Sequence, residues 1–124
     1  GLGDVYKRQG EAPTIHGDGG QSRDFTFIQN VIEANLAACN APDSAGGRSY
    51  NVALGGRISV LDLCLKIREL LGSDIEPNHS EPRAGDVRHS QASVELAAKE
   101  MGYRGSVDLD EGLLRTVAWY RDNV

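Results

Sequence analysis

Nine residues, 82–90 with the sequence PRAGDVRHS, hold two arginines, an aspartate, a histidine and a serine around one glycine. The segment follows a proline and lies between two stretches of helical periodicity. A polar loop of this kind is better suited to binding an anionic ligand than to filling a core. Residues 82–90 are therefore the first candidate site segment.

A second segment, residues 17–25 with the sequence GDGGQSRDF, adds a third arginine on a glycine-rich turn. A guanidinium group can bind a phosphate through two parallel charge-assisted hydrogen bonds, each contributing roughly 1.5–3 kcal/mol when shielded from water. Two converging arginines could hold a diphosphate, and Asp86 could accept hydrogen bonds from ribose hydroxyls. The candidates for binding charge are thus Arg23, Arg83 and Arg88.

Purely structural roles stay open for the same charged residues. Arg23 could pair with Asp24, and Arg83 or Arg88 with Asp86, as solvated surface contacts that contribute little. An aspartate beside a glycine also often braces a turn through backbone amides, which is the structural alternative for Asp86. The residues alone do not decide for Arg23, Arg83 or Asp86, and they favour a surface ion pair for Arg88.

Other kinds of chemistry lack their usual spacing. The histidines are irregularly placed and the cysteines are far apart, so we expect no metal site. Ser22 or Ser90 with His89 lacks the G-x-S-x-G elbow and a third orienting group, which disfavours a hydrolase. The glycines at 17, 19 and 20 fit neither phosphate-loop motif, since a serine takes the last place of G-x-G-x-x-G and no G-K-[ST] follows.

Composition narrows the class of protein. The chain has 124 residues and a formal net charge of −5 without a basic block, so a single domain with one core is expected and nucleic-acid binding is not. It has no apolar run of about 18 residues and no signal-peptide pattern, so we expect no membrane association. Cys39 and Cys64 fall on the apolar sides of expected helices, which is typical of a reduced, cytoplasmic protein.

The ends of the chain suggest a fragment. The sequence starts at Gly1 and its only methionine is Met101, so we expect residues 13–124 to be part of a longer protein. Residues 1–12 open with GLGDVYKRQ, which has no periodicity and resembles a non-native leader. We expect this leader to be non-native or disordered and give it no functional role.

Periodicity and turn residues predict how the two segments are positioned. We expect a hairpin-like pair of strands at 14–16 and 25–28, further strands at 50–54 and 75–79, and helices at 29–39, 60–71, 93–101 and 108–120. Ser59 with Asp62 forms a capping-box-like start, and Gly72 is placed for a C-terminal cap. Alternating strands and helices predict an α/β fold, or α+β for an isolated fragment, with the main sheet missing.

Four blocks of sequence carry a resemblance to a known family. They are GDGxQSRDFTFI at 17–28, YNVAxGGRxS at 50–59, PRAGDVRHSQA at 82–92 and EGLxxTVxWY at 111–120. In this order they resemble the C-terminal, substrate-binding part of the NAD-dependent nucleotide-sugar epimerases and dehydratases, the extended short-chain dehydrogenases with a Rossmann-type fold. The arginine segment is most similar to bacterial UDP-N-acetylglucosamine and UDP-glucose 4-epimerases of polysaccharide synthesis.

The resemblance implies roles for particular residues. Arg23 and Arg83 would contact the nucleotide diphosphate, and Asp86 the ribose hydroxyls of UDP. Four further matching residues would shape the pocket without touching the reacting carbon, namely Asp24, Arg88, His89 and Ser90. The sequence departs from the family at two places: His16 stands where relatives often have Asn or Tyr, and Ser93 where the helix cap is usually Asp.

The same resemblance implies chemistry that this chain cannot perform alone. The family holds NAD on a glycine-rich turn and moves a proton with a Tyr-x-x-x-Lys pair, while hydride passes between the sugar's C4 and the nicotinamide. None of these motifs is in this chain. The parent is expected to be a cytoplasmic, homodimeric NAD-dependent enzyme with a UDP-sugar substrate. The alternatives are a 4,6-dehydratase, a decarboxylase, or a non-catalytic nucleotide-binding module.

Overall fold

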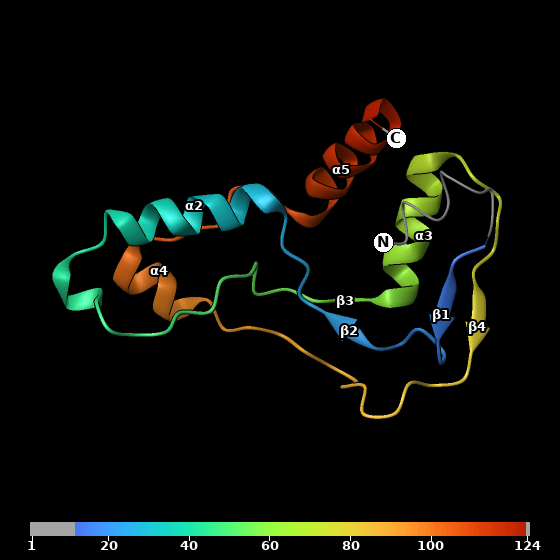
Figure 1. Cartoon of the computed structure of the whole chain (residues 1–124), viewed down its shortest axis with the longest axis horizontal. Coiled ribbons are helices and arrows are strands. Elements are labelled where there is room, and N and C mark those ends of the chain that lie inside the picture. The colour runs from blue at the N-terminus through green and yellow to red at the C-terminus, as the bar shows by residue number, and fades with distance from the viewer. Residues whose placement is uncertain (1–11, 124) are drawn as a thin grey trace. The chain divides into compact units, whose positions relative to one another are not determined.

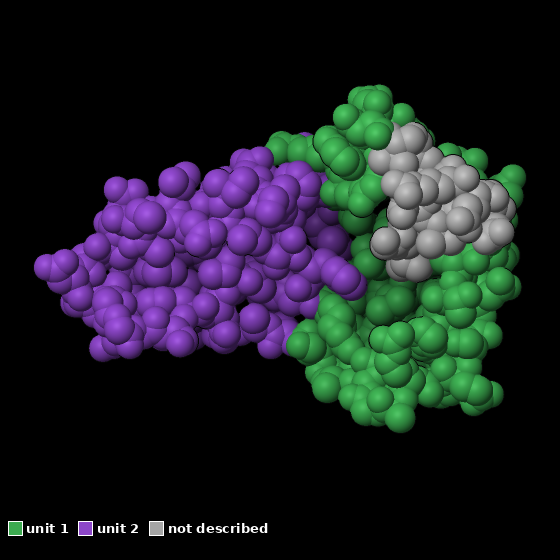
Figure 2. All heavy atoms as spheres, in the orientation of Figure 1, with its two compact units in different colours: residues 1–23, 58–90, 113–124 green, residues 24–57, 91–112 purple. Residues whose placement is uncertain are grey.

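The computed structural model describes residues 12–123, which form a small α/β fold (Figure 1). These residues cluster in two compact units: residues up to 23, 58–90 and from 113 onward form unit 1, and residues 24–57 and 91–112 form unit 2 (Figure 2). The expectation of a single core is therefore wrong. The leader predicted over residues 1–12 lies outside the described residues except for Ala12.

Unit 1 contains two short sheets. Strand β1 (Thr14–His16) pairs in parallel with β4 (Asn78–Ser80), beside which it lies in Figure 1. Strand β2 (Ser22–Arg23) pairs antiparallel with β3 (Ile58–Ser59). The predicted hairpin is wrong: residues 25–28 form no strand and Ile28 begins a helix, while the strand at 14–16 pairs with β4. β-prone composition indicates an extended backbone but not its partner. The strand predicted at 75–79 is found as β4.

Helix α3 (Val60–Leu71) follows β3 directly and has the predicted bounds. The Ser59 hydroxyl accepts a hydrogen bond from the Asp62 amide at 3.0 Å and donates one to its carboxylate at 2.7 Å. Gly72 ends the helix with φ of 65°, a left-handed conformation that glycine adopts without strain. Leu63, Cys64 and Ile67 lie at the centre of the predicted apolar face and are buried.

Helix α5 (Leu109–Asn123) begins as predicted, because the Asp108 carboxylate accepts from the Glu111 amide at 2.9 Å. Of its expected inward residues, Val117 is buried, whereas Leu114 and Trp119 are exposed. Helix α4 (Glu95–Met101) ends at Gly102 as predicted. The predicted cap at Ser93 is wrong: Val94 occupies the cap position and makes no side-chain cap bond.

Helix α2 (Ile28–Cys39) of unit 2 confirms the predicted helix but not its buried face. Asn30 and Ala34 are buried, while Ile28, Ile32 and Leu36 are 62%, 52% and 59% exposed. Cys39 is exposed as well. These three aliphatic residues, spaced four apart and here called the α2 stripe, leave the predicted apolar side of the helix uncovered in the described chain.

The strand predicted at 50–54 is absent. Backbone groups of this segment form hydrogen bonds with side chains instead of with a neighbouring strand. The Ala53 carbonyl accepts from the buried Tyr103 hydroxyl at 2.9 Å. The Asp24 carboxylate accepts from the Leu54 and Gly55 amides at 3.2 and 2.9 Å. A short 3-10 helix, η1 (Asp43–Ala45), precedes this segment. Asp24 thus braces a turn of unit 2.

The core of unit 2 centres on Ala34, Ala97 and Tyr103, with Tyr50, Val52 and Met101 packed against them. Asn30, fully buried, accepts from the Val107 amide at 3.0 Å and donates to its carbonyl at 2.7 Å. No helix among residues 12–123 has the length and apolar character that crossing a membrane requires.

Candidate functional site: an arginine-lined cavity in unit 1

A glycine loop leaves β1 and passes close to the start of α3. The Gly17 amide donates to the Ser80 carbonyl at 2.9 Å, which prolongs the β1–β4 pairing. Gly19 has φ of 77°, and a Cβ there would lie 2.8 Å from the Cβ of Leu61. Only glycine fits this approach, which brings the Leu61 amide to 2.9 Å from the Gly19 carbonyl.

The arginine segment, residues 82–90, is attached to β2 at its far end. The Ser22 amide donates to the Arg88 carbonyl at 2.8 Å, and the Ser90 amide donates to the Ser22 carbonyl at 3.0 Å. The buried Ser22 hydroxyl lies 2.8 Å from Nδ1 of His89. His89 and Ser90 therefore hold the arginine segment beside β2.

A cavity of about 290 Å³ lies between the two predicted segments. Its lining residues are His16, Gly17, Asp18, Gln21, Pro82, Arg83, Asp86 and Arg88. The structure thus brings together two segments that are distant in the sequence. Arg23 and Asp86, one from each segment, are hydrogen-bonded although they are more than sixty residues apart. Of the predicted site residues, Arg83, Asp86 and Arg88 line the cavity, whereas Arg23 supports it from β2.

Arg23 and Arg88 each have a carboxylate partner, and neither is the predicted one. Arg23 donates to Asp86 at 2.6 Å, and also to the Ser22 carbonyl at 2.8 Å. Arg88 donates to both carboxylate oxygens of Asp18, at 2.9 and 3.0 Å. The suggested pairs Arg23 with Asp24 and Arg88 with Asp86 are therefore wrong. The preference for a surface ion pair at Arg88 is confirmed.

The Asp18–Arg88 ion pair shifts the pKa of both side chains. The hydrogen bonds from Arg88, and next the Gly20 amide at 2.8 Å, lower the pKa of Asp18 below its ordinary value. The same hydrogen bonds raise the pKa of Arg88. Both side chains are exposed, with 60% and 65% of the Arg88 and Asp18 side chains accessible, so solvent screens their attraction.

Arg83 differs from the other two arginines. In the part of the chain that the structure describes, it has no carboxylate partner; its Nη2 lies 3.3 Å from Nε2 of His16. The other ring nitrogen of His16 lies 2.9 Å from the Ser80 hydroxyl. Arg83 therefore presents hydrogen-bond donors to the cavity, and no described carboxylate accepts from them.

Sequence reasoning missed three of the lining residues, His16, Asp18 and Gln21. Their signal was their position: all three flank or lie within the glycine turn that carries Arg23. Gln21 donates to the His16 carbonyl at 2.9 Å, so it stiffens the turn. No group of three or more His, Cys, Asp or Glu side chains within residues 12–123 is arranged to hold a metal ion.

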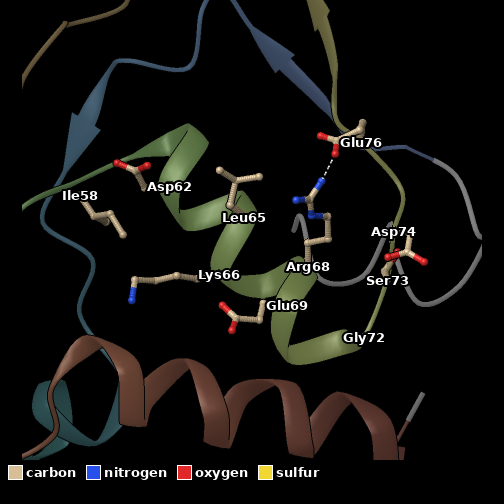
Figure 3. A pocket seen from close by; sticks show the side chains of 10 residues that line it. All are labelled: Ile58, Asp62, Leu65, Lys66, Arg68, Glu69, Gly72, Ser73, Asp74 and Glu76. Carbon is tan, nitrogen blue, oxygen red and sulfur yellow. Dashed lines mark hydrogen bonds and ion pairs between the residues drawn. The ribbon is translucent and has the colours of Figure 1, made fainter.

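A larger cavity, of about 790 Å³, lies along α3 and the turn that follows it (Figure 3). It contains none of the predicted site residues. Charges of both signs line it, and Arg68 is already paired with Glu76 across its edge (Figure 3). This arrangement gives no directed set of donors or acceptors, so the smaller cavity is the better candidate site.

Comparison with known proteins identifies the family of the chain and agrees with its fold. The model of the NAD-dependent epimerase/dehydratase family matches residues 4–53. The UDP-glucose 4-epimerase of Mycolicibacterium smegmatis is 33% identical over 113 residues, which are 91% of this chain and 36% of that protein. The chain belongs to the NAD-dependent epimerase/dehydratase family. The family predicted from the sequence is thereby confirmed.

Solved structures of the epimerase/dehydratase family agree with the fold. A UDP-glucose 4-epimerase from Thermotoga maritima, determined with UDP-glucose, superposes with a TM-score of 0.90 at 33% identity, over 98% of this chain and 38% of that one. MoeE5, determined with UDP-glucuronic acid and NAD, superposes with a TM-score of 0.89 at 31% identity, over 97% and 40%. The chain thus spans little more than a third of the length of these relatives.

Proposed function

We propose that this chain is the UDP-sugar-binding part of an NAD-dependent nucleotide-sugar 4-epimerase, of the UDP-glucose or UDP-N-acetylglucosamine type. The observation that carries the proposal is Arg83, whose donors face the 290 Å³ cavity without a described carboxylate partner. Arg83 is exposed in the described chain, and a guanidinium fork that a bound ligand shields from water is a usual protein ligand for a diphosphate. Its sequence context, residues 82–90, resembles the arginine segment of the epimerase family.

The roles of the neighbouring residues follow from their contacts. Arg83 binds the diphosphate directly, and Arg23 does so from β2 with the donors that its two described hydrogen bonds leave available. Asp86 uses one carboxylate oxygen for Arg23, so its second oxygen can accept from a ribose hydroxyl. Arg88, His89 and Ser90 keep the arginine segment in place.

The cofactor and the reacting groups are assigned to the longer parent. The chain has no G-x-x-G-x-x-G turn and no Tyr-x-x-x-Lys pair, so its residues do not fit an NAD site and we derive no catalytic step from them. Its contribution is to bind the nucleotide and orient the sugar. The parent is proposed to be a cytoplasmic homodimer that supplies precursors for polysaccharide synthesis.

The α2 stripe supports the proposal that residues 13–124 belong to a longer polypeptide. Aliphatic side chains that are more than half exposed along one side of a helix are typical of a surface that packs against another part of a protein. A free-standing nucleotide-binding module would be expected to cover them. A dehydratase or decarboxylase remains the second candidate within the family.

Substitution of Arg83 tests the proposal in the parent enzyme. Arg83→Ala removes a charge-assisted contact to the diphosphate, so KM for the UDP-sugar should rise about tenfold or more. Arg104→Ala is the matched control, because Arg104 is an exposed arginine outside the site segments, and its KM should be unchanged. An unchanged KM in Arg83→Ala would contradict the assignment.

A further inference from the structure

His16 lies at the end of β1 and lines the candidate cavity through contacts of both ring nitrogens. Its Nε2 is 3.3 Å from Nη2 of Arg83, and its Nδ1 is 2.9 Å from the hydroxyl of Ser80. Ser80 belongs to β4, whose parallel register sets it opposite His16. The ring is therefore held between a strand and the arginine segment.

The chemistry of these partners fixes the tautomer of the ring. A guanidinium group has donors only, so Nε2 of His16 must be an unprotonated acceptor for the contact with Arg83 to be a hydrogen bond. The ring proton then resides on Nδ1 and is donated to the Ser80 hydroxyl. In this state His16 is neutral and orients the side chain of Arg83 at the cavity wall.

We propose that His16 is a positioning residue for Arg83, and that protonation of its ring releases Arg83 and weakens binding of the nucleotide diphosphate. This inference rests on the proposed function. A second proton on the ring would turn the acceptor into a donor and place a cation about 3.3 Å from a guanidinium group. Repulsion would then move the guanidinium of Arg83 away from the orientation in which it faces the cavity. A displaced guanidinium loses the two parallel hydrogen bonds that it can otherwise donate to a phosphate.

The other charged groups around the cavity do not share this behaviour. They are Asp18, Asp86, Arg88 and, beside them, Arg23, His79 and His89. Asp18 is paired with Arg88 and Asp86 with Arg23, so these charges are compensated within the cavity wall. Nδ1 of His79 donates to the Gly17 carbonyl at 2.7 Å, and a carbonyl accepts whether the ring is neutral or charged. The Ser22 hydroxyl can donate to or accept from His89, so that contact also persists in both states.

Affinity for UDP-glucose as a function of pH tests the role of His16. The variant His16→Gln has an acceptor that can reach Arg83 but no titratable ring. His16→Asn also lacks the ring, and its shorter amide takes the position of Nδ1 beside Ser80. Calorimetry on the complete protein would compare Kd at about pH 8 and about pH 5.5, which bracket histidine titration. The diphosphate of UDP-glucose is esterified at both ends and keeps its charge over this range, so any change comes from the protein. A thermal melt at each pH confirms that each variant is folded.

The wild-type Kd should rise about fivefold or more at the lower pH, whereas either variant should change less than about twofold. Equal pH dependence in wild type and folded variants would overturn the positioning role. Tighter wild-type binding at low pH would overturn it as well, because His16 would then bind the anion directly. If wild-type protein fails to bind UDP-glucose at about pH 8, the proposed function itself is wrong, and the inference fails with it.

Discussion

Asp18 and Arg88 join the two site segments through two parallel hydrogen bonds, although they are seventy residues apart. A Cβ at residue 20 would lie 2.6 Å from Nη2 of Arg88, so Gly20 lets the guanidinium lie against the turn. The pair thus sets the spacing between the glycine turn and the arginine segment. This role is separate from binding of the diphosphate, which we assign to Arg83 and Arg23.

The lowered pKa of Asp18 predicts a pH dependence of stability. A carboxylate whose pKa is lower in the folded state stabilises the fold above its unfolded pKa, near 3.8, and this stabilisation is lost as pH falls through the folded pKa. Asp18→Asn should therefore lower the urea midpoint at neutral pH and reduce the loss of stability below about pH 4. Urea unfolding between about pH 7 and pH 2.5 measures both effects.

Asp74→Asn is the matched control for this prediction, because Asp74 is an exposed aspartate of the same unit outside the two site segments. It should leave the acid limb of the stability curve as in wild type. An Asp18→Asn protein with an unaltered acid limb would show that the Arg88 pair does not persist in solution.

Residue types alone predicted the site segments but not their internal pairing. Three arginines and an aspartate near glycines predict an anion-binding site, since few other residue sets suit that chemistry, and the site itself stays a prediction. Which arginine remains available depends on distances between segments that sequence spacing does not contain. Arg88 could be assigned to Asp18, and Arg83 to His16, only once β1 and the arginine segment were known to lie together.

At the scale of elements, local signals predicted helices well and strands poorly. The bounds of α3 follow from its own residues, Ser59 at the start and Gly72 at the end. In contrast, β1 requires β4 and β2 requires β3, partners that lie about sixty and about forty residues away. A β-prone run such as 50–54 has no such partner among the described residues, and its backbone bonds to side chains instead.

The helix cap at Gly72 provides a test at this scale. Its φ of 65° strains any residue with a Cβ, so Gly72→Ala should destabilise the chain by about 1 kcal/mol. Gly56→Ala is the control, because Gly56 lies outside the positive-φ region and a Cβ there meets no atom within 4 Å. Urea midpoints compare the two variants; equal midpoints would contradict the left-handed cap.

For the whole molecule, the sequence predicted the class and the family but not the two units. Four blocks predicted the family because a particular residue pattern in a particular order is far more specific than composition. The single core was expected from length alone, whereas the chain clusters into two units with separate buried residues. Ile32 and Leu36 of the α2 stripe were assigned inward from periodicity, which identifies an apolar face but not what covers it.

The α2 stripe gives a prediction at the scale of the whole protein. Ile32→Lys should leave the stability of the isolated 124-residue chain nearly unchanged, because Ile32 is already 52% exposed. In the parent epimerase the same change should destabilise the fold by about 2 kcal/mol or more, since it would place a charge in a packed contact. Ala38→Lys, exposed on another side of α2, is the control and should be tolerated in both proteins. Equal tolerance of Ile32→Lys in the parent would show that the stripe stays uncovered.

The central claim is that Arg83 binds the diphosphate of UDP, and calorimetric titration of UDP into the parent protein tests it most directly. We expect measurable binding by wild type and by Arg104→Ala, and an affinity about tenfold weaker or more for Arg83→Ala, because one charge-assisted contact is lost. Equal affinity of a folded Arg83→Ala protein and wild type would contradict the account.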